Sequence, residues 1–175
     1  TTFASYSDQV NHSNSVIICL SKAEISLRDI DRTERGYMLT QDTMYVRFMN
    51  NAVDSINKAI LQLQQMVADN EQQQKSITLL KGNVAIRIAA LRDNISYVDT
   101  AKSTAPSKYY FDSRQLMIEC SRMLRAIKLE ENILLKERFE IKQFYQQLAN
   151  RTLIFLLCVF CLVTLVLFIF MIREL

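Results

Sequence analysis

Three glutamates stand at positions where the sequence otherwise repeats apolar residues in alternating steps of four and three. Glu34 interrupts one such stripe, and Glu130 and Glu137 interrupt another, one heptad apart. Two neighbouring carboxylates can perform general acid–base chemistry. No nucleophile, metal-ligand cluster or glycine-rich loop accompanies Glu130 and Glu137, so the companions of a catalytic pair are missing. We therefore expect the chain not to be an enzyme and to hold no cofactor.

The cysteines and the histidine do not form a metal-binding pattern. Cys158 and Cys161 lie inside an apolar run, whereas Cys19 and Cys120 stand alone, with no CxxC spacing and no neighbouring histidine. His12 is the only histidine, and we expect it to be solvated. The sequence therefore predicts no metal site.

The run Leu153–Ile172 has the length and composition of a transmembrane helix. About 20 consecutive apolar residues cross a hydrocarbon core roughly 30 Å thick. This run contains no ionisable side chain, Thr164 is its only polar interruption, and Arg151 and Arg173 bound it. The alternative is a buried core helix, but a chain this short can hardly enclose a helix that is apolar on all sides.

The composition of the remainder favours long helices. The whole chain has 2 glycines and 1 proline, so it has few turns, and it is rich in good helix formers. About 150 residues outside the span suffice for one domain with a hydrophobic core. The formal net charge of +3 comes from both signs mixed along the chain, with no basic stripe. We expect no nucleic-acid partner.

Four helical segments are predicted, at 8–40, 43–68, 71–102 and from about 109 into the apolar run. Asp42 or Thr43 can cap the second segment and Asn70 the third. The loop at 103–107 contains Pro106, which disfavours helical dihedrals in the residue before it. Short connections between long helices predict an all-α, up-down-up-down antiparallel four-helix bundle over residues 1–150. The fourth helix then continues into a transmembrane segment, 151–175.

The apolar stripes predict which side chains form the core. In the first segment the stripe is Val16, Leu20, Ala23, Leu27, Ile30, Glu34 and Tyr37; in the second it is Met49, Val53, Ile56, Ile60, Leu63 and Val67; in the third it is Ile77, Val84, Ile88, Leu91, Ile95 and Val98; in the fourth it is Leu116, Cys120, Met123, Ile127, Glu130, Leu134, Glu137, Ile141, Phe144 and Leu148. In such a bundle the first helix begins beside the end of the fourth. Cys19 and Cys120 then differ in height by roughly 21 Å, too far for a disulfide.

Two blocks of this sequence resemble the signature of one family, the CHASE type 3 (CHASE3) domain. Residues 31–42 read DRTERGYMLTQD, and the family's usual form is a glutamate shortly before Arg-Gly-Tyr-x-Leu-Thr-Gly-Asp, with Gln41 here in place of Gly. Residues 130–138 read EENILLKER, similar to the family's Glu-Glu-x-x-Leu-Leu-x-x-Arg. Residues 68–73 resemble its mid-domain turn. The blocks occur in the family's order and span most of residues 5–150.

The resemblance implies an extracytoplasmic sensory module of a membrane receptor, whose output domain is not in this chain. Domains of this family occur on histidine kinases, nucleotide cyclases, diguanylate cyclases and chemoreceptors, and we rank a sensor histidine kinase first. It also implies a cell membrane location, with residues 1–150 in the periplasm or outside the cell. A parallel homodimer is expected, because family outputs generally act as dimers. No particular ligand is implied, so a small molecule or a protein remains open.

Glu34 needs a partner if it is buried on its stripe. Equal heights above the membrane place it near Glu119 of the fourth helix, so Arg114 and Arg122 are candidate partners, and Arg35 could meet Glu119. A structural ion pair that fixes helix register is the preferred interpretation, ahead of a ligand-binding cluster or exposed side chains. The motif and pairing candidates are Glu34, Arg35, Gly36, Tyr37, Thr40, Asp42, Arg114, Glu119 and Arg122.

Two of these motif residues have a predicted packing role. Gly36 inside a helix suggests close approach of another helix, or a bend into the turn at 40–43. Tyr37 continues the stripe, and we expect it in the core with its hydroxyl on a neighbour or on water.

The fourth helix is predicted to relay the signal through the membrane. Glu130 and Glu137 would make its packing imperfect and therefore switchable, and with Leu134 and Arg138 they form the predicted relay seam of this helix. Replacing both glutamates by leucine should lock the output in one state. The chief rival is a tail-anchored helical protein of the membrane-fusion or tethering class, which would also place its span near the C-terminus. An apolar helix upstream and a signalling domain downstream in the parent gene would favour the sensor.

Overall fold

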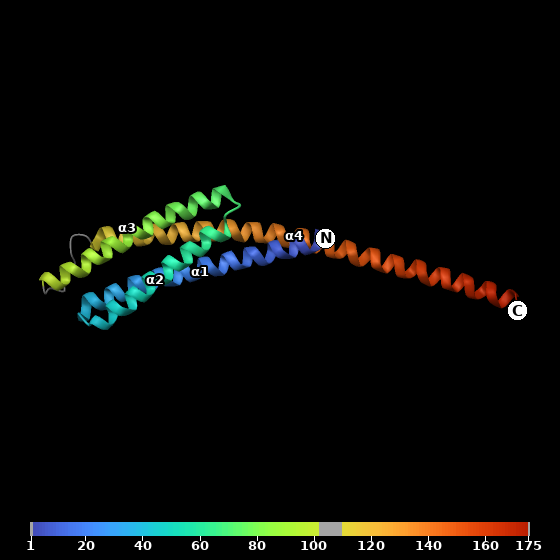
Figure 1. The fold of residues 1–175 in the computed structure, drawn as a ribbon, viewed down its shortest axis with the longest axis horizontal. Coiled ribbons are helices and arrows are strands. Elements are labelled where there is room, and N and C mark those ends of the chain that lie inside the picture. The colour runs from blue at the N-terminus through green and yellow to red at the C-terminus, as the bar shows by residue number, and fades with distance from the viewer. Residues whose placement is uncertain (1, 102–109, 175) are drawn as a thin grey trace. The chain divides into compact units, whose positions relative to one another are not determined.

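The computed structural model describes residues 2–101 and 110–174, and the described residues form four α-helices. They are α1 (Thr2–Thr40), α2 (Thr43–Met66), α3 (Glu71–Ala101) and α4 (Tyr110–Glu174) (Figure 1). The described part of the chain contains no strand, so the all-α prediction is confirmed. The predicted loop around Pro106 lies outside the described residues.

Both predicted helix caps are present. The Asp42 carboxylate accepts a hydrogen bond from the Met44 amide at 2.8 Å and starts α2. The Asn70 side-chain oxygen accepts one from the Gln73 amide at 3.1 Å and starts α3. Each cap satisfies an amide that the first helical turn leaves unpaired.

The turn between α1 and α2 is made by a residue with left-handed backbone. Gln41 has φ 56°, and it is the one non-glycine residue with positive φ among the described residues. Glycine adopts this conformation without a steric penalty, which explains why the motif usually has glycine there. Gln41 therefore keeps the turn at an energetic cost.

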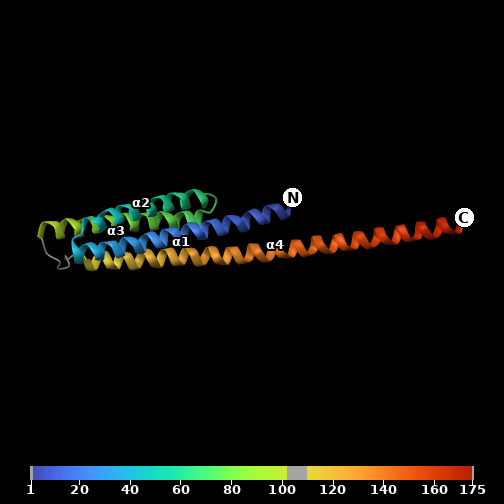
Figure 2. The ribbon, with the colours of Figure 1, turned by 90° about the horizontal axis from the view of Figure 1, so that it is seen from below.

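Residues 12–134 form one compact unit, a four-helix bundle with antiparallel sequential neighbours. Figure 2 shows α2 and α3 as one pair and α1 beside α4. Side-chain contacts join neighbours around the bundle: the Ser26 hydroxyl donates to Ser55 at 2.8 Å between α1 and α2, and Lys128 of α4 lies 3.7 Å from Glu24 of α1. The up-down-up-down topology is therefore confirmed.

The core of the bundle is built from the predicted stripes of the first three helices. All seven stripe residues of α1 and all six of α2 are buried, and so are five of the six predicted for α3, with Ile95 half-buried. Fully burying one such leucine or isoleucine stabilises the fold by about 1.5–3 kcal/mol. These stripes alternate in steps of four and three, the spacing that keeps one helix face on the bundle axis.

The stripe predicted for α4 is partly wrong. Cys120 and Ile127 are buried as predicted, but Leu124 and Glu131 are buried in place of Met123 and Glu130. Glu130 is exposed, and Met123 is half-buried. The predicted stripe runs from Cys120 to Ile127 in a step of three followed by a step of four, whereas the buried residues follow a step of four and then a step of three. Reversing the order of the two steps moves the residue between them by one position, from Met123 to Leu124. The facing helices select the order: the Gln73 side-chain amide of α3 donates to the Glu131 carboxylate at 2.5 Å.

A second compact unit comprises residues 1–11 and 135–175, of which the structure describes 2–11 and 135–174. Within it, the rings of Tyr6 and Tyr145 stack with centroids 5.2 Å apart, so the start of α1 lies beside α4 as predicted. Three residues predicted for the core stripe, Ile141, Phe144 and Leu148, are 41–64% exposed. That part of the prediction is wrong, because the short α1 segment covers a different face of α4.

The apolar run Leu153–Ile172 is helical and exposed throughout. Among the described residues, α4 is the one helix that is long and apolar enough to cross a membrane, and none of its most apolar stretch is buried. A buried core helix would show the opposite, so the exposure favours a transmembrane helix.

Candidate functional site

A buried carboxylate joins three helices of the bundle. Glu34 on α1 is 2% exposed and forms an ion pair with Arg87 of α3, which is 1% exposed. It also accepts hydrogen bonds from the Asn94 side-chain amide of α3 at 2.9 Å and from the Ser113 hydroxyl of α4 at 3.4 Å. We call Glu34, Arg87, Asn94 and Ser113 the polar layer. The prediction that Glu34 is buried with a cationic partner is confirmed.

The partners predicted for Glu34 are wrong. Arg114 is exposed, and Arg122 pairs with Glu119 on its own helix at 2.6 Å. Arg35 pairs with Asp31 and not with Glu119. Matching heights on α1 and α4 found the right level, because Ser113 is adjacent to Arg114, but it ignored the direction of the side chains and the whole of α3.

A signal for the true partners was present in the sequence. The core-facing stripe of α3 alternates regularly in steps of three and four through Ile77, Leu80, Val84, Arg87, Leu91, Asn94 and Val98. Hydrophobicity alone favours the neighbouring Ile88 and Ile95 over Arg87 and Asn94, which is why the predicted stripe omits the two polar residues. A carboxylate on one stripe requires a cation on a facing stripe, and Arg87 is that cation.

The polar layer is only partly satisfied. The Nε and Nη1 atoms of Arg87 are buried and have no hydrogen-bond partner among the described residues. A buried guanidinium donor without an acceptor destabilises the fold. A hydrogen-bond network with unpaired donors therefore favours its arrangement less strongly than a network in which every donor is paired. The layer therefore bonds Glu34 of α1 to two other helices, and Arg87 would gain free energy in an arrangement that paired its remaining donors.

The two motif residues after Arg35 pack as predicted. A Cβ atom on Gly36 would overlap the ring of Tyr45 on α2, so Gly36 permits the close approach of the two helices. Tyr37 is 5% exposed, and its hydroxyl donates to the Asp99 carboxylate of α3. This hydrogen bond, with burial, raises the pKa of Tyr37.

The end of the motif forms the turn into α2. The Thr40 hydroxyl donates to the Gly36 carbonyl at 2.8 Å and accepts from the Asp42 amide at 3.3 Å. With the Asp42 cap, these contacts fix the conformation of the chain around Gln41. Thr40 and Asp42 are exposed and have a structural role in the turn.

The residues predicted as a relay seam on α4 do not share one environment. Glu130 and Glu137 are exposed, whereas Leu134 and Arg138 are half-buried. The buried acid of this helix is Glu131, 2% exposed, which sequence reasoning missed although it belongs to the same motif block. Ile127, four residues before Glu131, is also buried. This spacing of one helical turn was the signal in the sequence that Glu131 shares the buried face of Ile127.

The cysteines of the bundle are buried thiols. Cys19 and Cys120 are free, and the Cys19 thiol contacts the Ala59 carbonyl oxygen at 3.4 Å. Burial raises the pKa of Cys120 to about 11. His12 is exposed, and the described residues contain no group of acidic, histidine and cysteine side chains arranged to hold a metal.

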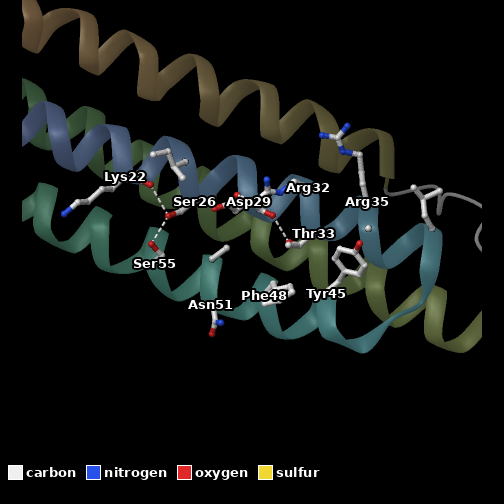
Figure 3. Close-up of a pocket in the computed structure, with 14 residues that line it drawn as sticks. Lys22, Ser26, Asp29, Arg32, Thr33, Arg35, Tyr45, Phe48, Asn51 and Ser55 are labelled. Carbon is white, nitrogen blue, oxygen red and sulfur yellow. Dashed lines mark hydrogen bonds and ion pairs between the residues drawn. The ribbon is translucent and has the colours of Figure 1, made fainter.

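A groove lies on the surface between α1 and α2. Figure 3 shows side chains of α1, from Lys22 to Arg35, along one side and Tyr45, Phe48, Asn51 and Ser55 of α2 along the other. Its volume is about 1,080 Å³. Thr33, Arg35 and Gly36 of the motif line it, so the motif contributes both to the polar layer and to this groove.

Comparison with known families identifies the class of this protein. The model of the CHASE3 domain matches residues 6–140, and the chain therefore belongs to the CHASE3 domain family. The chain is a sensory module of a signalling receptor: an extracytoplasmic domain of a membrane protein with a candidate transmembrane helix. The resemblance noted in the two sequence blocks is confirmed.

One solved structure is similar to this chain. The sensor domain of the Rhodopseudomonas palustris histidine kinase HK9 shares 19% sequence identity, covers 76% of this chain and 98% of its own, and superposes with a TM-score of 0.49. No curated protein sequence matches the chain significantly.

Proposed function

We propose that this chain is the input module of a transmembrane receptor, with a sensor histidine kinase as the first candidate. In this proposal α4 relays a change in bundle packing across the membrane to an output domain elsewhere in the receptor. The chain performs no catalysis itself. The CHASE3 match supports the sensor over a tail-anchored tether.

The observation that carries this proposal is the polar layer. One carboxylate on α1 is bonded to side chains of α3 and α4 at once, so a displacement of α1 changes a contact with α4. The Nε and Nη1 atoms of Arg87, which have no hydrogen-bond partner within 2–101 and 110–174, supply a reason for a second arrangement. A stimulus then shifts the equilibrium by its differential affinity for the two arrangements.

A chimeric receptor tests the relay. Joining this chain to the cytoplasmic part of a histidine kinase of known activity gives autophosphorylation in membrane vesicles as the readout. The double variant Glu34→Leu with Arg87→Met removes the polar layer while keeping the side chains large and apolar. We expect a several-fold change in basal autophosphorylation with the bundle still folded, as judged by circular dichroism. A folded variant with unchanged autophosphorylation would contradict the relay.

We further propose a parallel homodimer, formed along an exposed stripe of α4 whose apolar span contacts lipid. Glu137, Ile141, Phe144 and Leu148 follow one another in steps of four and three and are exposed in the single chain. A membrane-spanning helix holds two copies at equal depth, so identical residues face each other in a parallel pair. Buried in a dimer, these side chains would lose their contact with water.

Disulfide cross-linking tests the dimer. In a chain whose Cys158 and Cys161 are replaced by alanine, Phe144→Cys should give cross-linked dimers in membranes after mild oxidation. Phe139→Cys is the matched control, because residue 139 is 46% exposed but points about 140° away around the helix. Equal cross-linking at both positions would argue against this stripe.

A further inference from the structure

The groove between α1 and α2 has the dimensions of a binding site for a small organic molecule. Its volume of about 1,080 Å³ lies slightly above the range of roughly 300–1,000 Å³ found for ligand pockets. Its lining on α1 extends from Lys22 to Leu39, a rise of about 25 Å at 1.5 Å per residue. The groove is therefore suited to an elongated ligand.

Apolar side chains in the groove are left in contact with water. Ile25 is 57% exposed, Leu39 is 77% exposed and Phe48 is 44% exposed. All three line the groove, and they come from both of its helices. An apolar ligand body lying over them would remove their surface from water, and this burial would favour binding.

The charged side chains of the groove are mostly cationic. Lys22, Arg32 and Arg35 line it, and Asp29 is the one acidic residue among its lining side chains. Arg32 contacts Asp29 at 2.7 Å, and Arg35 pairs with Asp31 of the same helix; the two arginine side chains are 77% and 58% exposed. Exposed pairs of this kind contribute little to stability. The Arg32 guanidinium can therefore exchange this carboxylate for that of a ligand at little cost.

One end of the groove is shaped by Gly36. The Tyr45 ring lies where a Cβ atom of residue 36 would be, and both residues line the groove close to the turn between the helices. Farther along, Ser26 and Ser55 are hydrogen-bonded across the groove at 2.8 Å and hold α1 and α2 together. The two helices therefore contact each other at two points of the groove.

We propose that this groove binds an amphipathic organic anion. Its carboxylate or phosphate group bonds to the guanidinium groups of Arg32 and Arg35, and its apolar body lies over Ile25 and Phe48. Arginine binds both anionic groups with paired, charge-assisted hydrogen bonds. The inference rests on the proposed sensory function and adds the chemical class of the ligand.

The same helix connects the groove to the polar layer. Thr33 lines the groove, and the next residue, Glu34, is bonded to α3 and α4. A ligand that changes the spacing of α1 and α2 therefore changes the position of Glu34 relative to Ser113. This gives a physical route from the groove to α4 within the bundle.

The experiment uses the full chain in nanodiscs of uncharged lipid, with empty nanodiscs as the blank. Four probes share one aromatic body: 3-phenylpropionate, 3-phenylpropyl phosphate, 3-phenylpropylamine and 3-phenylpropanol. Saturation-transfer NMR titrations should show binding of one or both anions and at least tenfold weaker binding of the amine and the alcohol. The two anions distinguish a carboxylate site from a phosphate site. Equal binding of the amine, or no binding of either anion, would overturn the proposal.

Variants locate the binding. Arg32→Gln with Arg35→Gln should weaken anion binding at least tenfold, and Ser55→Trp should block the groove with a similar loss. Arg92→Gln is the matched control, because Arg92 is an exposed arginine of α3 outside the groove. Anion binding that survives both groove variants would place the site elsewhere.

Failure of this inference and failure of the proposed function are distinguishable in the chimeric receptor. If no anion binds but the polar-layer variant alters autophosphorylation, the groove proposal is overturned and the sensory function stands. If anions bind in the groove and autophosphorylation is unchanged when the groove is saturated with anion, the binding site is supported and the relay is contradicted.

Discussion

The bundle of residues 12–134 and the segment of α4 from 135 to 174 use the same heptad spacing with opposite results. In the bundle, the stripes are buried, and polar interruptions such as Glu34 and Glu131 have partners on other helices. On α4 beyond residue 134, Ile141, Phe144 and Leu148 are exposed at the same spacing. The spacing shows that a helix needs an apolar neighbour, but not whether the neighbour lies in the same chain.

This difference divides the sources of stability. The bundle is stabilised by contacts within one chain, so single substitutions in its core should change its free energy of unfolding. The exposed stripe of α4 has no such contacts to lose, and its substitutions should act on association or on the membrane-embedded state. Matched pairs of substitutions in the two regions can test this distinction.

The largest effect is expected at the polar layer. Glu34→Gln leaves the buried Arg87 guanidinium without its counter-charge, which should cost about 3–5 kcal/mol of the free energy of unfolding. Glu137→Gln, at an exposed glutamate of α4, should change it by less than about 0.5 kcal/mol. Urea denaturation followed by circular dichroism measures both. Similar losses in the two variants would show that the regions do not differ as described.

Truncating a leucine in each region sharpens the comparison. Leu124→Ala removes a side chain that is 2% exposed and should cost about 2–5 kcal/mol through the cavity it leaves. Leu148→Ala affects a side chain that is 50% exposed, so we expect almost no change in bundle unfolding and weaker cross-linking through position 144. A large loss of bundle stability from Leu148→Ala would indicate that this stripe is packed within the chain.

The dryness of the bundle core can be measured through Cys120. Its pKa is about 11 in the folded chain against an ordinary value of 9.0. The thiol of the unfolded chain therefore deprotonates at a lower pH than that of the folded chain. The free energy of unfolding is unaffected by the ionisation of Cys120 below pH 9 and decreases as the pH rises from 9 to 11. The loss is roughly 2 kcal/mol. Cys120→Ala should remove it from the difference in unfolding free energy between pH 8 and pH 11, and an unchanged difference would contradict the buried thiol.

The smallest effect separates the two glycines of the bundle. Gly36→Ala must displace the Tyr45 ring and should cost about 1 kcal/mol or more. Gly82→Ala meets no atom within 4 Å in the middle of α3 and should stabilise the helix by about 0.5–1 kcal/mol. Thermal unfolding of the two variants should therefore shift in opposite directions.

Much of this fold follows from local rules that the sequence displays. Scarce glycine and proline predict long helices, Asp42 and Asn70 mark helix starts, and the stripes of α1 and α2 identify their buried faces. These features depend on residues close in the chain. The polar layer does not: Arg87 reads as a break in the stripe of α3 until Glu34 is known to face it.

The phase of α4 was harder to predict for a related reason. Both Glu130 and Glu131 fit an alternation of three and four, and Gln73 of another helix decides which one is buried. Beyond residue 134 the stripe through Phe144 is as regular as any in the bundle, yet Ile141, Phe144 and Leu148 are exposed. Sequence periodicity cannot state how many chains share a core.

The three contacts of Glu34 also bear on the order in which the chain folds. Its partners lie 53, 60 and 79 residues farther along the sequence. During synthesis α1 and α2 can pair as a hairpin well before Ser113 exists, and Glu34 then remains in water. The carboxylate is withdrawn from solvent only when α3 and α4 arrive, so its desolvation belongs to a late step of folding. In a receptor that folds in this order, the part of the core around Glu34, within the motif at residues 31–42, is the last to be buried.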